Sequence, residues 1–348
     1  MSVNSQELSN SQSVQVVIGL NAAIVSVVKG SPHCLVVSRT SPDTSSDVER
    51  EGTESSGWDS LPFGPFDPLE HRTLEQGLRA WVQQQTHLTP GYVEQLYTFG
   101  DRGRHARAGG NTGDSHIVSV GYLAFARPGG NEVSVGEWRD WYMFFPWEDR
   151  RAGRPALLDR VILPCLAEWA AAQNHESESV RMRGYPQDRM RICFGLEGVA
   201  WDEEKTLERY ELLYEAGLMP EAGRDGRCGL SLPEKDAAAL GHPMQHDHRR
   251  ILATAMGRLR GKLKYRPVIF DLMPDSFTLY ELQRTVEAIS GVVLHKQNFR
   301  RLVDHAGLVE RTGRITTRTG GRPAELYRFR HEVLTEHHAP GLRLTTRS

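Results

Sequence analysis

The most regular apolar periodicity lies near the C-terminus. Apolar side chains recur there at intervals of three or four, at Leu279, Leu282, Val286 and Ile289. This spacing predicts an amphipathic helix, and Thr278 and Glu281 have the spacing of a capping box at its start. Ser290-Gly291 would end the helix. A second helix is predicted from about His295 to Ala306, with inward positions at Phe299, Leu302 and Val303.

Two strand-like pieces follow the second helix. They read LVERTG and AELYRF, and the turn-rich segment between them reads RITTRTGGRP. Two short helices followed by a hairpin are the layout of a winged helix, which we expect over residues 265–335. The alternative is a small packing domain with a few surface arginines. Residues 336–348 would form a C-terminal tail.

Positive charge is concentrated in this part of the chain. From Phe277 to the C-terminus there are 12 lysines and arginines against seven aspartates and glutamates, whereas the formal charge of the whole chain is −2. A local excess of this kind favours counterion release from nucleic acid. We therefore predict double-stranded operator DNA as a partner. The predicted DNA-binding residues are Thr278, Lys296, Asn298, Arg300, Arg301, Arg314, Arg318 and Arg322.

Strands and helices alternate in the N-terminal half. Apolar runs predict strands at 14–28, 34–39, 92–99 and 117–126, and a further apolar piece spans residues 140–147. Helical periodicity predicts helices at 69–85 and 155–173. This order is typical of an α+β domain with a mixed sheet, over residues 14–200. Two polar stretches lack apolar residues to bury: residues 1–13 should be disordered, and residues 40–57 should form a flexible insertion.

Residues 201–264 read as a helical connector between the two domains. Apolar stripes predict helices at 202–222 and 246–262. These stripes could form the surface of a homodimer that reads two DNA half-sites. They could equally pack against their own chain.

The segment around Gly64 resembles a degraded Nudix box. LPFGP is followed by Glu70, six residues after Gly64, and by a helix containing LRAWVQQQTHL. The family pattern is GX5EX7REUXEEXGU, and Arg79 fits its arginine if one residue is inserted. The family's magnesium-binding glutamates correspond here to Ala80, Gln83 and Gln84. Because neutral side chains cannot replace ionised carboxylates around Mg²⁺, the resemblance implies a Nudix-like fold without hydrolase activity.

A Nudix-like domain joined to a winged helix is similar to the Nudix-related transcriptional regulators of NAD metabolism, the NrtR group and the longer NadQ-like group. KLKYRPVIFDLMPDSFTLYELQRTVEAISG, NFRRLVDHAGLVERTGR and GRPAELYRF resemble the winged helix of that family, and GDRGR is similar to its ligand-side loop. The resemblance implies a repressor of NAD biosynthesis genes controlled by NAD, ADP-ribose or ATP. It implies effector contacts at Gly64, Arg102, Arg104 and Arg107. Arginine suits a pyrophosphate because its planar fork donates two parallel hydrogen bonds, although arginines in a Gly-rich loop can also be simply solvated.

Other classes of protein are less consistent with the sequence. The polar N-terminus and the absence of a long apolar run argue against a secreted or membrane protein, so we expect a cytoplasmic one. The four cysteines form no CxxC pair, and neither a metal nor a cofactor is expected. The rival function is a Nudix-type pyrophosphatase acting on ADP-ribose or a related nucleotide diphosphate. A third possible function is that of an adaptor that binds RNA or protein through the winged helix.

Overall fold

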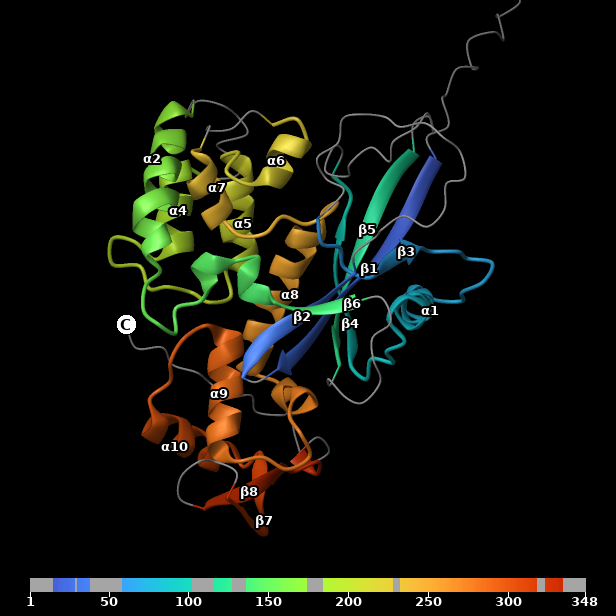
Figure 1. Cartoon of the computed structure of the whole chain (residues 1–348), viewed down its shortest axis with the longest axis vertical. Helices are drawn as coiled ribbons and strands as arrows, with labels where there is room; N and C mark the ends of the chain where they lie inside the picture. The colour runs from blue at the N-terminus through green and yellow to red at the C-terminus, as the bar shows by residue number, and fades with distance from the viewer. Residues whose placement is uncertain are drawn as a thin grey trace, which may run out of the picture.

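The computed structural model describes residues 15–28, 30–37, 58–101, 115–126, 136–173, 184–227, 232–317 and 323–333. Three parts of the sequence-based domain division lie outside these residues: the N-terminal segment 1–13, the insertion 40–57 and the tail 336–348. Figure 1 shows a twisted sheet with a helix on one face, a helical layer on the other face and a winged helix below both.

The sheet is mixed, as the sequence predicted. Its strands follow the order β4-β5-β1-β2-β6, and β3 pairs with β1 at the side of this path. β1 runs parallel to β5, from Gln15 against Ser115 to Val25 against Phe125, and forms an antiparallel hairpin with β2. The strands are β1 (Gln15–Val28), β2 (Ser31–Val37), β3 (Phe63–Pro65), β4 (Val93–Phe99), β5 (Ser115–Phe125) and β6 (Gly136–Asp140).

Both faces of this sheet are covered because β1 is apolar at successive positions. Leu20, Ala22 and Ile24 pack with Leu78 and Val82 of helix α1 (Leu74–Thr86). The intervening side chains of β1 face the opposite side, where helix α8 (His248–Leu263) crosses the sheet (Figure 1). A strand buried on both faces reads as a continuous apolar run, which is how β1 appears in the sequence.

The apolar run at residues 140–147 folds into two 3-10 turns. β6 ends at Asp140, whose carboxylate accepts a hydrogen bond from the amide of Tyr142 at 2.8 Å and so starts a 3-10 turn, η1 (Trp141–Met143). A second turn follows, η2 (Pro146–Glu148), in which Pro146 has no amide hydrogen to give to a sheet. The apolar run is therefore buried as compact turns and not as a strand.

The predicted helix at 155–173 contains a wide turn. Its first part is a π-helix, η3 (Leu158–Ile162), and an α-helix, α2 (Leu163–Ala172), continues from it. Pro164 lies in the first turn of α2, where it cannot donate to the carbonyl four residues earlier. The π-turn is a local adjustment to that missing bond.

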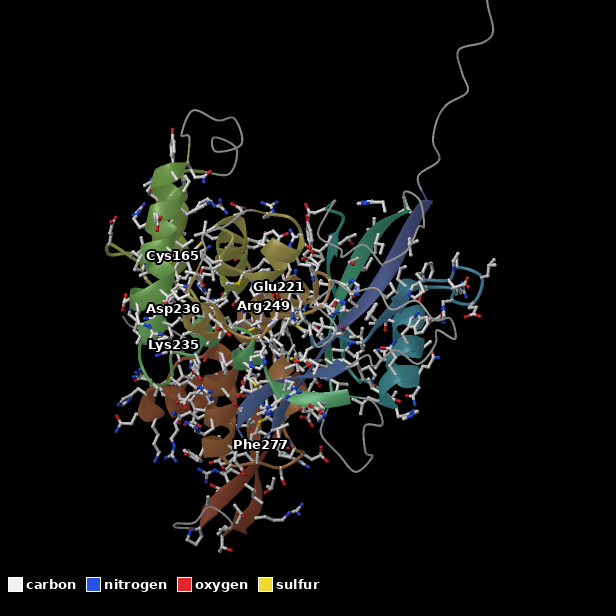
Figure 2. The ribbon with its side chains drawn as sticks, turned by 45° about the horizontal axis from the view of Figure 1, so that its top comes forward. Cys165, Glu221, Lys235, Asp236, Arg249 and Phe277 are labelled. Carbon is white, nitrogen blue, oxygen red and sulfur yellow. The ribbon has the colours of Figure 1, made fainter. Side chains whose placement is uncertain are left out.

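Within the described residues, the rest of the helical layer consists of four short helices and α8. They are α4 (Pro186–Phe194), α5 (Thr206–Glu215), α6 (Pro220–Arg224) and α7 (Glu234–Ala239). The single helix predicted at 202–222 is thus two, because Gly217 turns with a φ of +70° and Pro220 starts α6. Figure 2 shows Arg249 of α8 beside Glu221 of α6, in the middle of the molecule. The guanidinium and carboxylate are 3.4 Å apart and both side chains are buried.

The apolar stripe of α8 packs inside its own chain. Ile251, Leu252, Ala255, Met256 and Leu259 are all 0% exposed. Of the two roles left open for this stripe, intramolecular packing is the one observed, and these side chains cannot form a dimer surface while the chain stays folded.

The winged helix begins with a 3-10 turn, η4 (Val268–Leu272), and is closed by a bridge between Phe277 and Tyr327. Figure 2 places Phe277 at the far end of the molecule from Cys165 of α2. The remaining elements are α9 (Leu279–Ser290), α10 (Lys296–Ala306), β7 (Val309–Thr316) and β8 (Ala324–Phe329). No helix in the described ranges is both long enough and apolar enough to traverse a lipid bilayer.

Candidate nucleic-acid interface and effector site

Helix α9 packs against α10, the second helix of the winged helix. The capping box predicted at its start is present: the amide of Glu281 donates to Thr278 Oγ1 at 3.1 Å, and the amide of Thr278 donates to the Glu281 carboxylate at 2.7 Å. Thr278 is 1% exposed, and its hydroxyl is engaged in this cap. A buried cap residue cannot reach a phosphate, which corrects the prediction that Thr278 contacts DNA.

Helix α10 has one apolar face and one charged face. Phe299 and Val303 are buried against the winged-helix core. The four residues predicted to contact DNA from this helix, Lys296, Asn298, Arg300 and Arg301, are all exposed. The closest polar contact among them joins Arg301 Nη2 to Asn298 Oδ1 at 3.5 Å, which is the limit for a hydrogen bond. These side chains are therefore accessible to base edges and phosphates.

The predicted wing is a two-stranded antiparallel hairpin. β7 and β8 pair from Val309 opposite Phe329 to Thr316 opposite Ala324, and the register shifts between Arg311 and Ile315. Gly313 lies in this bulge with a φ of +71°, a conformation that favours glycine. Arg314 beside it is exposed. Arg318 and Arg322 lie outside the described residues, so their predicted contacts stay predictions.

Among the described residues, the exposed cations of α10 and the wing include several without an ion-pair partner. Within the described ranges, Lys296, Arg300, Arg301 and Arg314 have no carboxylate within salt-bridge distance. Arg311 and Arg328 of the same hairpin are paired, with Glu325 and Glu310 respectively. Unpaired cations lose little when they exchange water for a phosphate, so this surface is suited to a polyanion.

Helix α1 corresponds to the Nudix-box helix. It begins at Leu74 and not at Leu69, because Thr73 caps it by accepting a hydrogen bond from the amide of Gln76 at 3.2 Å. The positions of the family's glutamates, Ala80, Gln83 and Gln84, are exposed on its surface. Gln83 accepts a hydrogen bond from the hydroxyl of Thr89 at 2.9 Å. In the part of the chain that the structure describes, no three His, Cys, Asp or Glu residues are grouped so as to hold a metal ion.

Gly64 serves the packing of α1. A Cβ atom placed there would lie 2.2 Å from the ring of Trp81, and the indole nitrogen of Trp81 donates to the carbonyl of Pro65 at 2.8 Å. The close approach that the glycine allows is therefore made by Trp81. Trp81 thus fills the space left by the missing side chain, and the predicted effector contact at Gly64 stays a prediction.

The predicted effector arginines Arg102, Arg104 and Arg107 lie outside the described residues. The last described residue before them, Asp101, pairs with Arg250 of α8. Both line a cavity of about 800 Å³ whose other walls come from the helical layer, chiefly α4 and α5, a volume within the usual range for small-molecule sites. Its other lining residues include Arg189, Cys193, Lys205, Glu211 and Arg227.

Comparison with known proteins bears on the winged helix and on the overall architecture. Residues 269–329 match the family model described as the NrtR DNA-binding winged helix domain. The fold of the whole chain matches the crystal structure of Shewanella oneidensis NrtR complexed with a 27mer DNA, with a TM-score of 0.50 and 19% identity over 94% of this chain and 99% of that one. The chain has the NrtR architecture. A second crystal structure of Shewanella oneidensis NrtR matches with a TM-score of 0.50 and 21% identity, over 90% of this chain and 94% of that one.

One curated relative extends the likeness to NrtR at the level of sequence. The ADPR responsive transcriptional repressor NtrR of Acinetobacter baylyi is 43% identical over 91 residues, which are 26% of this chain and 36% of that protein. The match thus spans about a third of the relative's length. The Nudix-like mixed sheet followed by an NrtR-type winged helix agrees with the sequence-based fold class.

The sequence did not reveal the residues that join the winged helix to the rest of this NrtR-like chain. Tyr142, Glu148 and Arg260 are fully buried or nearly so and meet at the end of α9. Tyr142 lies in the apolar run at residues 140–147, Glu148 directly follows that run, and Arg260 lies in the helix predicted at 246–262. The acidic residue at the end of that run, Glu148, was the only local signal, since an acid next to so many aromatic residues needs a buried partner.

Proposed function

We propose that this protein is a DNA-binding transcriptional repressor whose affinity for its operator is controlled by ADP-ribose. The observation that carries the proposal is the exposed, unpaired cationic face of α10 beside the wing, in a domain that matches the NrtR winged helix. The genes under its control would be those of NAD biosynthesis, as the resemblance to the NrtR and NadQ-like regulators implies.

The DNA contacts divide into two kinds by position. α10 has the length and the polar face of a helix that enters the major groove, where an asparagine can pair with adenine and an arginine with guanine. Asn298 and Arg301, one helical turn apart, are the proposed base readers. Lys296, Arg300 and the wing arginines Arg314, Arg318 and Arg322 are proposed to bind phosphates.

ADP-ribose is the proposed effector because the Acinetobacter relative is described as ADPR-responsive. NAD and ATP share its adenosine and phosphate groups and are the competing ligands. Arg102, Arg104 and Arg107 are proposed to pair with the pyrophosphate, since guanidinium groups bind phosphate oxygens through two parallel bonds. The cavity next to Asp101 gives such a ligand room on the side of the sheet that carries α8.

Regulation without hydrolysis is proposed for the Nudix-like domain. Ala80, Gln83 and Gln84 offer no carboxylate to a magnesium ion, and they occupy the positions where the resemblance places the catalytic glutamates. The rival, a pyrophosphatase, would release AMP from ADP-ribose in the presence of Mg²⁺. A homodimer is also proposed, with a surface other than the buried stripe of α8, because two recognition helices are needed to read two half-sites.

The proposal can be tested by selecting duplexes from a randomised pool with the purified protein and then measuring affinity for the selected duplex by fluorescence anisotropy. We expect specific binding that ADP-ribose changes at least fivefold and that NAD and ATP change less. The same samples, analysed for AMP by chromatography, should show no cleavage. Failure to enrich any duplex at low salt, or turnover of ADP-ribose, would reject the proposal.

A further inference from the structure

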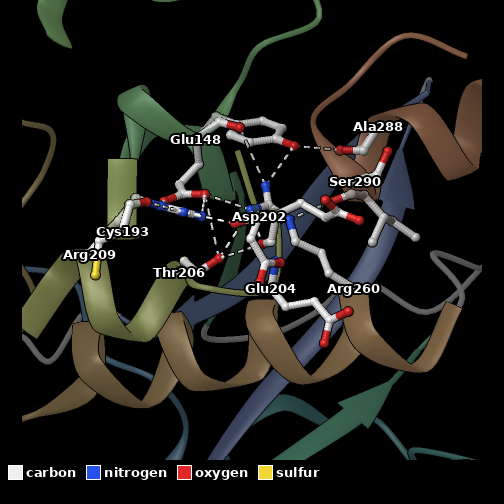
Figure 3. Close-up of polar contacts among 12 residues, drawn as sticks. Glu148, Cys193, Asp202, Glu204, Thr206, Arg209, Arg260, Ala288 and Ser290 are labelled. Atoms are coloured by element: carbon white, nitrogen blue, oxygen red, sulfur yellow. Dashed lines mark hydrogen bonds and ion pairs between the residues drawn. The ribbon is translucent and has the colours of Figure 1, made fainter. Parts of the chain in front are cut away.

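A buried charged cluster lies where the helical layer meets the winged helix. Its charged members are Glu148 of η2, Arg209 of α5 and Arg260 of α8, each at most 1% exposed. Arg209 donates to the Glu148 carboxylate at 2.6 and 2.9 Å, and Arg260 donates to it at 2.6 Å (Figure 3). We call these three residues with Thr206 and Tyr142 the Glu148 cluster.

One carboxylate thus neutralises two guanidinium groups only in part. The excess of positive charge is met by backbone carbonyls: Arg209 donates to the carbonyls of Cys193 and Asp202, at 2.9 and 2.8 Å. Arg260 donates to the carbonyl of Glu203 at 3.0 Å and to the hydroxyl of Thr206 at 3.1 Å. Because a buried cation needs every one of these partners, the cluster holds its surrounding segments in fixed positions.

The cluster also caps the C-terminal end of α9. The last carbonyls of any helix have no partner within it, and α9 ends at Ser290. Here the hydroxyl of Tyr142 donates to the carbonyl of Ala288 at 2.7 Å, and Arg260 Nε donates to the carbonyl of Ile289 at 2.9 Å. A cation at this end also interacts favourably with the helix dipole.

The backbone just beyond α9 fits closely against the same groups. Gly291 has a φ of +74°, and a Cβ atom there would lie 2.5 Å from the carbonyl oxygen of Glu148 and 2.9 Å from the hydroxyl of Tyr142. The amide of Arg150 donates to the Gly291 carbonyl at 2.8 Å. Because α10 begins at Lys296, only five residues after Gly291, the direction of α10 depends on where this turn is held.

We propose that Tyr142 and Arg260 are positioning residues that fix the orientation of the DNA-reading helix relative to the sheet and the helical layer. They touch no DNA themselves; they act by capping α9, which sets the place of α10. The consequence for operator binding rests on the proposed function, whereas the mechanical role does not. Arg209 gives the cluster a second connection, since its bond to Cys193 reaches a residue that lines the cavity beside Arg250.

The mechanical role is tested by hydrogen exchange of the full-length protein, read by mass spectrometry on peptides that cover residues 286–295. Tyr142→Phe removes one hydroxyl and should accelerate exchange there about fivefold, the effect of one lost hydrogen bond. Arg260→Lys should accelerate it further, because an ammonium group cannot reach Glu148 and Ile289 at once. Peptides from α1 provide the reference and should not change.

Two matched controls separate this role from general damage to the core. Tyr214→Phe removes another tyrosine hydroxyl of the core, which donates to Asp225 at 2.7 Å, and Arg249→Lys alters an equally buried arginine of α8. Neither contacts α9, so neither should selectively accelerate exchange at residues 286–295. Equal acceleration in Tyr214→Phe and Tyr142→Phe, or none in Tyr142→Phe and Arg260→Lys, would overturn the proposal.

The affinity for operator DNA provides a second test of the proposal. We expect Tyr142→Phe and Arg260→Lys to lower affinity for the selected duplex several-fold and Arg249→Lys, at a residue that lines neither the cavity nor the winged helix, to leave it unchanged. Unchanged affinity and unchanged response to ADP-ribose in variants whose α9 exchanges faster would overturn the positioning claim. If the wild-type protein binds no duplex, the proposed function fails, and the exchange data alone decide whether Tyr142 and Arg260 hold α9.

Discussion

Arginines occur in two contrasting settings in this molecule. In the core beside α8, Arg209, Arg249 and Arg260 are at most 1% exposed and are bound by carboxylates and carbonyls. On the winged helix, Arg300 and Arg314 are exposed and have no carboxylate partner within the described ranges. The difference separates structural cations from cations that are available to a ligand. Residue type and local charge do not make this distinction; the partners do.

The largest effect that distinguishes the buried arginines from the exposed ones is expected for Glu148→Ala. It leaves two buried guanidinium groups without their carboxylate, and loss of one member of a buried pair costs about 3–5 kcal/mol of stability. Urea denaturation should show a decrease of that size in the free energy of unfolding. Glu310→Ala, which breaks the exposed pair with Arg328, should cost about 1 kcal/mol or less. Similar losses for the two variants would show that burial does not separate the two kinds of arginine.

The Glu148 carboxylate also makes the free energy of unfolding depend on pH. Burial by itself would raise the pKa of Glu148, but Arg209 and Arg260 outweigh it and hold that pKa below the ordinary value. A lowered pKa in the folded state means that the stabilisation is complete above about pH 4.3, the ordinary value for glutamate, and is lost as the pH falls through the lower folded value. The difference in unfolding free energy between wild type and Glu148→Gln should therefore shrink on acidification below about pH 4. A difference that grows in acid would contradict this assignment.

Asn298→Ala and Arg301→Ala test whether the exposed side chains of α10 are available to DNA. If these side chains read bases, each substitution should weaken binding to the selected duplex by about 1–3 kcal/mol and leave binding to random DNA nearly unchanged. Fluorescence anisotropy on both duplexes measures the two affinities. Arg160→Ala, an exposed arginine of the helical layer, should alter neither. Equal losses on both duplexes would reassign Asn298 and Arg301 to phosphate binding.

The smallest expected effect belongs to the wing. Arg314→Ala should weaken binding to all sequences alike and reduce the slope of log affinity against log salt by about 1, because one fewer counterion is released. A salt titration on specific and random duplexes measures this slope. An unchanged slope would mean that Arg314 does not reach the DNA backbone.

Much of the fold was predictable because its signals are local. The capping box at Thr278 and Glu281 and the stop at Gly291 depend on neighbours within a few residues, and all three are present. The alternation of strands and helices predicted a mixed sheet, which the β1–β5 pairing confirms. The two faces of α10 followed in the same way from periodicity. Where a tight turn interrupts a periodic pattern, as at Gly217 within residues 202–222, the prediction of a single helix was wrong.

The sequence by itself therefore determined that a mixed-sheet domain is followed by a basic winged helix, because helix caps, apolar periods and clustered charge act over short distances. Only the tertiary structure decided which charged side chains are buried and which residues cap the end of α9. Arg260 lies 112 residues from Glu148, and Tyr142 lies 146 residues from Ala288. The free-energy cost of burying a charge depends on the partners that folding brings to it, and no local sequence pattern shows which residues those partners are.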